Sequence, residues 1–448
     1  MITLQKTFLY VSMASFVLFI MYFISLSQNS VPHQRLFTEQ GALSYSSWPH
    51  FRSKSNNDQA LYHNCWSMDV KLDVHDMLVH QLSKLPTSKV ESCRDLDLLI
   101  KSVYSINSRS STRLELPPIF AAQVKSWLGN SDKLLHKLHQ QEVIHVSQHM
   151  TGEHVVYNPV RSHRPMPHTA ESGQMLVDRL ALETQVACDF CNVDTRTAFD
   201  GFARHETNSS VRVSNTFKME RWHLMVVTKS PHHHPTKMSR SLYTAFVSDA
   251  VLLAREIMAT ELNMSHPHLA WDTLPKAGAS QMHPHIHVLA APLRYYGFTE
   301  LLREAGEVHY RSTGRNLFNS MLEVHWSLNL TASYGDATAL AMLSGKGDLE
   351  VMVLSEEPGN DLYSLMYFVT KAYHDSFEQY CYSLVMSWHG DKKSNVGVMP
   401  AMARIMSRGD CSSPRADYSS FEIYQAVYRQ HDPWEVINAV RLAIKQYS

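Results

Sequence analysis

Three histidines occupy alternating positions in the run His283-Pro284-His285-Ile286-His287. In an extended strand, side chains at alternating positions project from the same face, so this run presents three imidazoles together. An imidazole can bind a transition metal, exchange a proton near neutral pH, or attack an electrophile. Taken alone, the run is equally compatible with a metal site and with a catalytic nucleophile.

A turn of small residues lies just upstream of this run. Gly278-Ala279-Ser280-Gln281 supplies backbone N–H groups, a hydroxyl and a carboxamide. Such donors stabilise the oxygens of a transferring phosphoryl group. The turn and the histidines together therefore indicate a phosphate held against a histidine nucleophile.

The segment from this turn to the second histidine resembles a known signature. Gly278-Ala-Ser-Gln-Met-His-Pro-His285 agrees at five of eight positions with Gly-Cys-Ser-Asn-Pro-His-Pro-His, the signature of the galactose-1-phosphate uridylyltransferase branch of the histidine triad superfamily. The resemblance covers about residues 150–448. Its other segments, in chain order, are Tyr157-Asn158-Pro159, Arg161-Ser-His-Arg164-Pro165, Ser230-Pro231-His232-His233 and a C-terminal part with Glu422, Arg429 and Asp432.

The resemblance implies a structural zinc site. Cys188 and Cys191 form a CxxC pair, and with two histidines they would surround zinc as two thiolates and two imidazoles. One histidine is His283, and register against the Ser-Pro dipeptide favours His233 as the other. A lone CxxC pair is also typical of a redox pair or of two buried thiols, but the two placed histidines favour zinc.

The resemblance also implies roles around a nucleotide. His285 would attack the α-phosphorus of a nucleotide diphosphate compound and carry the nucleotidyl group as a phosphoramidate until an acceptor takes it. Ser280 would stabilise the phosphoryl oxygens in this step. The residues implied to bind substrate are Arg161, Arg164, Asn215, Gly278 and Gln281. Without the resemblance, the arginines are ordinary surface charge, and Asn215 is equally compatible with a turn or strand-end cap.

His287 departs from the uridylyltransferase pattern, which has glutamine at this position, whereas histidine is usual in the hydrolytic branch. Glutamine can only form hydrogen bonds, but an imidazole can also move a proton. The favoured function is nucleotidyl transfer between a nucleotide sugar and a sugar 1-phosphate. The alternative is a hydrolase or phosphorylase of nucleotide sugars or dinucleotides. A non-catalytic nucleotide-sugar-binding protein is a second alternative, disfavoured because a binding module needs no nucleophile.

The elements that must position these residues alternate between strands and helices. The pattern predicts strands at 211–217, 222–228, 283–289, 348–354 and 380–388, and helices at 239–262, 362–377 and 433–447. This order predicts an α+β fold of the histidine-triad type, with antiparallel sheets and helices on one face. The two similar halves would be residues 146–297, with the His-Pro-His motif, and 298–448. Upstream, we predict a small helical region at 61–145 and a polar stem at 27–60.

The remaining sequence features concern location and partners. The chain of 448 residues has 41 basic and 42 acidic side chains, which disfavours a nucleic-acid partner. After a short tail, 1–7, the uncharged segment 8–26 is long enough to cross a bilayer and predicts a transmembrane signal-anchor. Asn208, Asn263 and Asn329 fit the N-glycosylation pattern, which predicts a type II single-pass glycoprotein with a lumenal catalytic region in the endoplasmic reticulum or Golgi. A Cys65–Cys93 disulfide and a homodimer are both compatible with the sequence.

Overall fold

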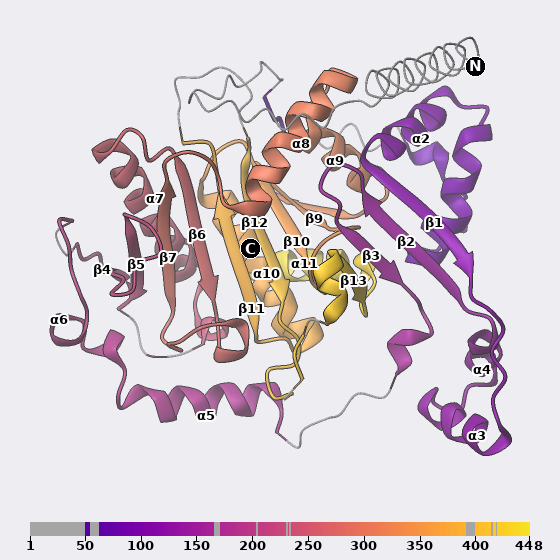
Figure 1. The fold of residues 1–448 in the computed structure, drawn as a ribbon, viewed down its shortest axis with the longest axis horizontal. Helices are drawn as coiled ribbons and strands as arrows, with labels where there is room; N and C mark the ends of the chain where they lie inside the picture. Colours follow the sequence, from indigo (N-terminus) through magenta and orange to yellow (C-terminus); the bar gives the residue numbers. More distant parts are fainter. Residues whose placement is uncertain are drawn as a thin grey trace, which may run out of the picture. The chain divides into compact units, whose positions relative to one another are not determined.

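A computed structural model describes residues 50–53, 62–164, 171–202, 205–229, 232, 234–390, 399–413, 415–417 and 419–448. Two sheets organise these residues (Figure 1). The larger sheet is antiparallel throughout, and its nine strands run in the order β4-β5-β7-β6-β11-β12-β10-β9-β8. In that order the strands are Ser210–Ser214, His223–Thr228, His285–Ala291, His266–Asp272, Tyr382–Ser387, Ala401–Ser407, Val351–Ser355, Ala337–Ala341 and Thr331–Tyr334.

The smaller sheet has four strands in the order β1-β2-β3-β13, which are Tyr104–Ser110, Glu142–Gln148, His154–Tyr157 and Ala426–Arg429. Strands β3 and β13 pair in parallel, so this sheet joins the N-terminal part of the chain to its C-terminal part. Three helices of the predicted helical region are α2 (Glu91–Val103), α3 (Pro118–Trp127) and α4 (Asp132–His139). The same region also contains β1 and β2, which a purely helical prediction missed.

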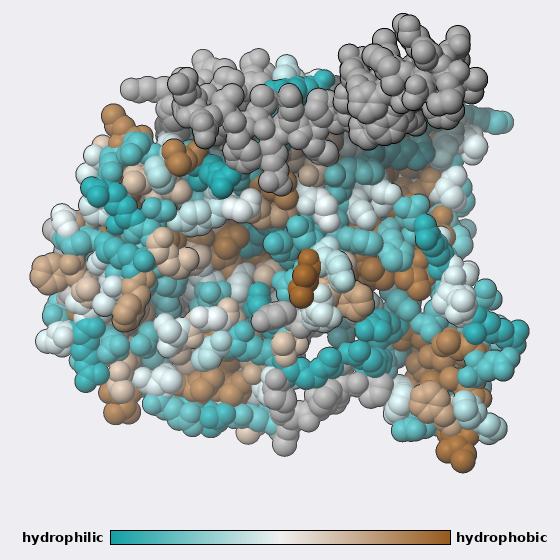
Figure 2. Space-filling model, in the orientation of Figure 1, coloured by the Kyte–Doolittle hydropathy of each residue, from teal (hydrophilic) through white to brown (hydrophobic). Residues whose placement is uncertain are grey.

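The α3–α4 hairpin extends from the far end of β1 and β2 (Figure 1). Val124 and Leu128 form its small core together with Val160. Hydrophobic atoms gather on the surface of this hairpin in Figure 2, and its exposed apolar side chains include Ile119 and Trp127. The hairpin therefore has too little of its own interior to bury all of its apolar residues.

Two long helices cover one face of the large sheet. Helix α7 (Arg240–Thr260) follows β5, and α10 (Asn360–Phe377) follows β10. Ser239 caps α7 by accepting a hydrogen bond from the backbone of Leu242. The final helix, α11 (Pro433–Tyr447), has the predicted bounds and packs on α10. The described residues also form the α-helices α5 (Gly173–Gln185), α6 (Val193–Arg196), α8 (Gly297–Thr313) and α9 (Leu317–Ser327).

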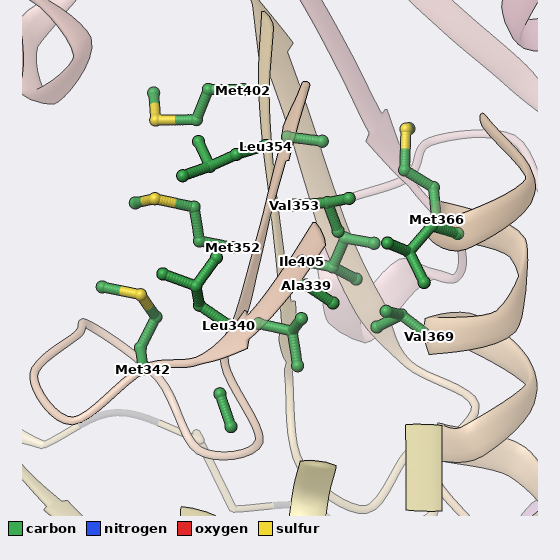
Figure 3. Close-up of a cluster of buried hydrophobic side chains, with 14 of the residues drawn as sticks. Ala339, Leu340, Met342, Met352, Val353, Leu354, Met366, Val369, Met402 and Ile405 are labelled. Atoms are coloured by element: carbon green, nitrogen blue, oxygen red, sulfur yellow. The ribbon is translucent and has the colours of Figure 1, made fainter. Parts of the chain in front are cut away.

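In the C-terminal half of the large sheet, apolar side chains are buried on both faces. Val353 and Ile405 pack against Met366 of α10 (Figure 3). Figure 3 shows Met352 and Met402 projecting from the opposite face, where they are also buried. Burial of an apolar side chain of this size contributes about 1.5–3 kcal/mol, so this half is a rigid support for the strands beside it.

The prediction of an N-terminal transmembrane helix is corrected by the structure. Within the ranges described above, no helix is both long enough and apolar enough to cross a bilayer. The fold of the described residues is therefore given as α+β with two sheets, and the predictions of a transmembrane signal-anchor and of a single-pass membrane protein with a lumenal catalytic region are withdrawn. Residues 8–26, on which the prediction depended, lie outside the described residues.

Candidate active site and metal centre

Four residues from three separate segments meet at one end of β7. Cys188 precedes a short 3-10 turn (Asp189–Cys191) and Cys191 ends it, His232 follows β5, and His283 precedes β7. Their potential ligand atoms all lie within 4.8 Å of one another. Nδ1 of His283 is 3.6 Å from Sγ of Cys188 and 3.5 Å from Sγ of Cys191. These residues can hold a metal ion.

Both histidines turn the same nitrogen toward the thiols. Nε2 of His283 donates to the carbonyl oxygen of Thr228 at 2.7 Å, so in the neutral ring Nδ1 carries the lone pair. Nε2 of His232 lies 2.6 Å from Oγ1 of Thr184, whose own proton goes to the carbonyl of Leu180 at 2.7 Å. His232 must therefore donate to this oxygen, which also leaves its lone pair on Nδ1. Two imidazole lone pairs and two thiols suit a tetrahedral centre, and the outer hydrogen bonds are those that orient metal-bound histidines.

The structure brings His232 to this cluster, whereas His233, which the Ser-Pro register favoured, lies outside the described residues. Burial and the neighbouring Cys188 raise the pKa of Cys191 to about 11. At neutral pH this thiol therefore holds its proton until a cation displaces it.

His285 is the first residue of β7, and it is buried beside the metal cluster. Its Nδ1 donates to the carbonyl oxygen of His283 at 2.9 Å, which leaves the lone pair on Nε2. Burial, followed by the neighbouring His287, lowers the pKa of His285 to about 4. The ring of Phe190, which lies between the two cysteines in sequence, packs 5.1 Å from the His285 ring. At neutral pH, His285 is thus an uncharged imidazole with one oriented lone pair, as a nucleophile requires.

His287 lies on the same face of β7, with its ring centroid 5.0 Å from that of His285. Its Nδ1 is 2.9 Å from Nε2 of His223, the first residue of β5. Burial, and then His223, lower the pKa of His287 to about 4. Burial and then Lys218 also lower the pKa of His223. The sequence-based assignment missed His223. The only available signal was a histidine within a predicted strand, and the strand register that brings it to His287 was unknown.

Asn215, a predicted substrate-binding residue, is near this histidine pair. Its Nδ2 lies 3.4 Å from Nε2 of His223, and its Oδ1 accepts a hydrogen bond from the backbone of Phe217. The turn that leads toward β7 carries Gly278 and Ser280, both exposed. Gly278 has φ +109°, a conformation that favours glycine. Nε2 of Gln281 donates to Asp189 at 3.4 Å, so this residue contacts the cysteine turn.

The two predicted arginines lie elsewhere. Arg161 lies over the ring of Tyr428 in β13, with its guanidinium carbon 4.9 Å from the ring centroid. Burial raises the pKa of Tyr428, and the charges of Arg161 and Arg164 partly offset this rise. Figure 1 shows the segment after β3 separated from β7 by other strands of the large sheet. The structure therefore does not place these arginines beside His285.

Two polar C-terminal residues of the resemblance have structural contacts. Asp432 caps α11 by accepting from the backbone of Trp434, and it also accepts from Val74. Arg429 is buried and donates to the carbonyl of Met342. Glu422 lies in a 3-10 turn, Ser420–Tyr424.

No protein-family model matches the chain, and no curated protein matches its sequence. Solved structures do share its fold. The chain is similar to an ADP-glucose phosphorylase from Arabidopsis thaliana, solved with bound ADP-glucose, with a TM-score of 0.52 and 13% identity over 67% of this chain and 98% of that one. A GalT-like protein from Arabidopsis thaliana (TM-score 0.47, 13% identity, 57% and 91% covered) and a uridylyltransferase (0.46, 13%, 67% and 98%) are also similar. The likeness to the ADP-glucose phosphorylase confirms the expected resemblance at the level of the fold.

Proposed function

We propose that this protein transfers nucleotidyl groups through a covalent nucleotidyl-His285 intermediate. The observation that carries the proposal is the orientation of His285, whose Nδ1–H is held by the carbonyl of His283 while Nε2 keeps its lone pair. A residue that only packed in a core would not need this arrangement beside a second oriented imidazole. The fold shared with an ADP-glucose phosphorylase supports the same reaction class.

In the first step, Nε2 of His285 attacks the α-phosphorus of a nucleotide sugar. A P–N bond forms, and the bond from the α-phosphorus to the bridging oxygen breaks, so that a sugar 1-phosphate leaves with the electron pair. In the second step, an oxygen of the acceptor attacks the same phosphorus and the P–N bond breaks. The neutral state of His285 favours attack, and the phosphoryl oxygens need hydrogen-bond donors nearby. His287 and Ser280 are the proposed donors.

A sugar 1-phosphate is the favoured acceptor, and inorganic phosphate or water is the alternative. The histidine at position 287 keeps this alternative open because an imidazole can move a proton. The base and the sugar are left to experiment, and adenine and uracil nucleotides are the first to test. The ADP-glucose bound by the similar phosphorylase supports the nucleotide-sugar class.

Zinc is the metal we propose for the four-residue cluster, held by Cys188, Cys191, His232 and His283. When bound, zinc would close a tetrahedral structural site and supply no reacting group. The protein residues then link this site to catalysis in two ways. The carbonyl of His283 orients the nucleophile, and Phe190, between the two cysteines, packs against its ring.

The test is to incubate the full chain with nucleotide sugars labelled on the α-phosphate. We expect an acid-labile label on the protein that His285→Ala abolishes. His136→Ala, a change at an exposed histidine in α4, is the matched control and should label normally. Absence of label with every nucleotide sugar tested, or label that persists in His285→Ala, refutes the covalent mechanism. Discharge of the label by sugar 1-phosphate, by phosphate or by water alone then identifies the acceptor.

A further inference from the structure

The contact between His287 and His223 fixes where each ring carries its proton. His223 is 2% exposed, and its Nδ1 accepts a hydrogen bond from the backbone N–H of Met219 at 3.2 Å. A backbone N–H can only donate, so Nδ1 of His223 holds a lone pair. In the neutral ring, the proton of His223 must then be on Nε2.

This proton determines the state of the second ring. Nε2–H of His223 points at Nδ1 of His287, 2.9 Å away, so Nδ1 of His287 is the acceptor. The proton of His287 must therefore be on its own Nε2. Asn215 Nδ2 is the longer contact of His223, at 3.4 Å, and it also donates to Met225. The amide therefore does not displace the contact between the two rings.

The two neighbouring imidazoles of β7 are consequently held in opposite states. His285 donates through Nδ1 and presents a lone pair on Nε2. His287 accepts at Nδ1 and presents an N–H at Nε2. One ring is thus ready to attack a phosphorus, and the ring beside it is ready to donate to a phosphoryl oxygen.

We propose that His223 is a positioning residue that holds His287 as a fixed N–H donor, so that His287 does the work of a carboxamide. This proposal rests on the proposed function and bears on the choice of acceptor. A histidine that activates water must offer the water a lone pair. His287 can do so only by moving its proton from Nε2 to Nδ1. Its Nδ1, however, already accepts the hydrogen bond from Nε2–H of His223. The arrangement favours transfer to a phosphate-bearing acceptor over hydrolysis.

The first test reads the proton directly and does not depend on activity. Nitrogen NMR of the full chain with ¹⁵N-labelled histidine should show His287 protonated at Nε2 and unprotonated at Nδ1 near neutral pH. In His223→Ala the His287 signals should become those of a mixture of both states. His223→Gln, whose amide can donate to Nδ1, should restore the single state. A wild-type His287 protonated at Nδ1 would overturn the proposal, even if the protein proves to have no enzymatic activity.

The second test separates positioning from a general structural effect. In His223→Ala, the ratio of hydrolysis to transfer of the labelled intermediate should rise at least about tenfold. The reason is that the freed imidazole of His287 can act as a general base, and general-base catalysis accelerates a reaction roughly 10²–10⁴-fold. His287→Gln alone should keep transfer dominant. Adding His223→Ala to His287→Gln should not raise hydrolysis further. An equal rise in the presence of His287→Gln would overturn the proposal, because His223 would then act without His287. Failure to form any label would refute the proposed function and leave the NMR result decisive for the tautomer.

Discussion

The threonine behind the candidate metal site gives a quantitative test of the proposed zinc centre. Oγ1 of Thr184 accepts the Nε2 proton of His232, at 2.6 Å, while its own proton goes to the carbonyl of Leu180. Thr184→Val keeps the shape of the side chain and all four ligands, and it removes this acceptor. Nε2 of His232 would then lose this hydrogen bond, and the ring would lose a restraint that turns Nδ1 toward Cys191.

The expected size of the effect follows from this outer hydrogen bond. Loss of such a partner lowers metal affinity about 10- to 100-fold. Each factor of ten is about 1.4 kcal/mol, so the free energy of zinc binding should weaken by about 1.4–2.7 kcal/mol. At a fixed free zinc concentration well above both dissociation constants, the free energy of unfolding should fall by about the same amount.

The assay is a competition for zinc between the purified chain and a chromogenic chelator, followed by urea unfolding at buffered zinc. Thr195→Val is the control, since Thr195 is exposed and bonds only weakly, at 3.4 Å, to the carbonyl of Asn192. Cys191→Ser should weaken binding further because it replaces a thiolate ligand. Zinc affinity unchanged in both Thr184→Val and Cys191→Ser would refute the assignment of these residues to a metal site.

Two further predictions concern the neutral state of the nucleophile and the support of its sheet. Burial lowers the pKa of His285 to about 4, and only the neutral ring attacks phosphorus. The rate of labelling should therefore be constant from about pH 8 down to about pH 5 and decline near pH 4. A decline in this rate centred near pH 6.5, the ordinary pKa of histidine, would contradict the prediction. Asp249→Asn should destabilise the fold by about 3–5 kcal/mol in urea unfolding, because the buried Arg212 donates to Asp249 at 2.7 Å and would lose its buried counter-charge. Glu256→Gln, at the exposed partner of the same arginine, should cost less than about 1 kcal/mol, and equal losses in the two variants would show that burial is not the cause.

The sequence predicted the strands of the site well because local patterns determine them. Alternation placed His285 and His287 on one face of a strand, and the structure keeps them there. The local pattern also predicted the strand that became β5 and the helix that became α7. These signals need only near neighbours in the chain.

The contacts that the sequence could not supply come from residues far apart in the chain. His223 reaches His287 only because β5 and β7 pair with Met225 opposite His287, a register that no local pattern specifies. A Ser-Pro dipeptide could not distinguish His232 from His233, because the dipeptide does not specify the conformation of the chain that follows it. Arg161 was placed near the phosphate by its motif, yet the segment that carries it follows the smaller sheet.

The second half of the sheet differs from the half that carries the proposed active site. Strand order is mirrored about the contact between β6 and β11, and one cross-strand row runs through Met225, His287, Ala270, Val385, Arg404 and Met352. Ala270 and Val385 pair at the centre of this row, so Arg404 occupies the position that mirrors His287. Met402, two residues before Arg404, likewise mirrors His285.

The mirrored positions are closed to a substrate. Arg404 is bound to two buried carboxylates, Glu350 and Glu153, and stacks over the ring of Phe298 at 4.0 Å. Met402 is buried among the methionines of Figure 3. A direct alignment of His283-Pro284-His285 with Met399-Pro400-Ala401 would match the two prolines. It would, however, pair His285 with Ala401. Because neighbouring strand residues point to opposite faces, Ala401 lies on the face opposite to Met402 and Arg404. The two halves therefore repeat each other in strand order and register. The second half, whose mirrored positions are filled by side chains, is a rigid support for β6 and β7, which carry the histidines.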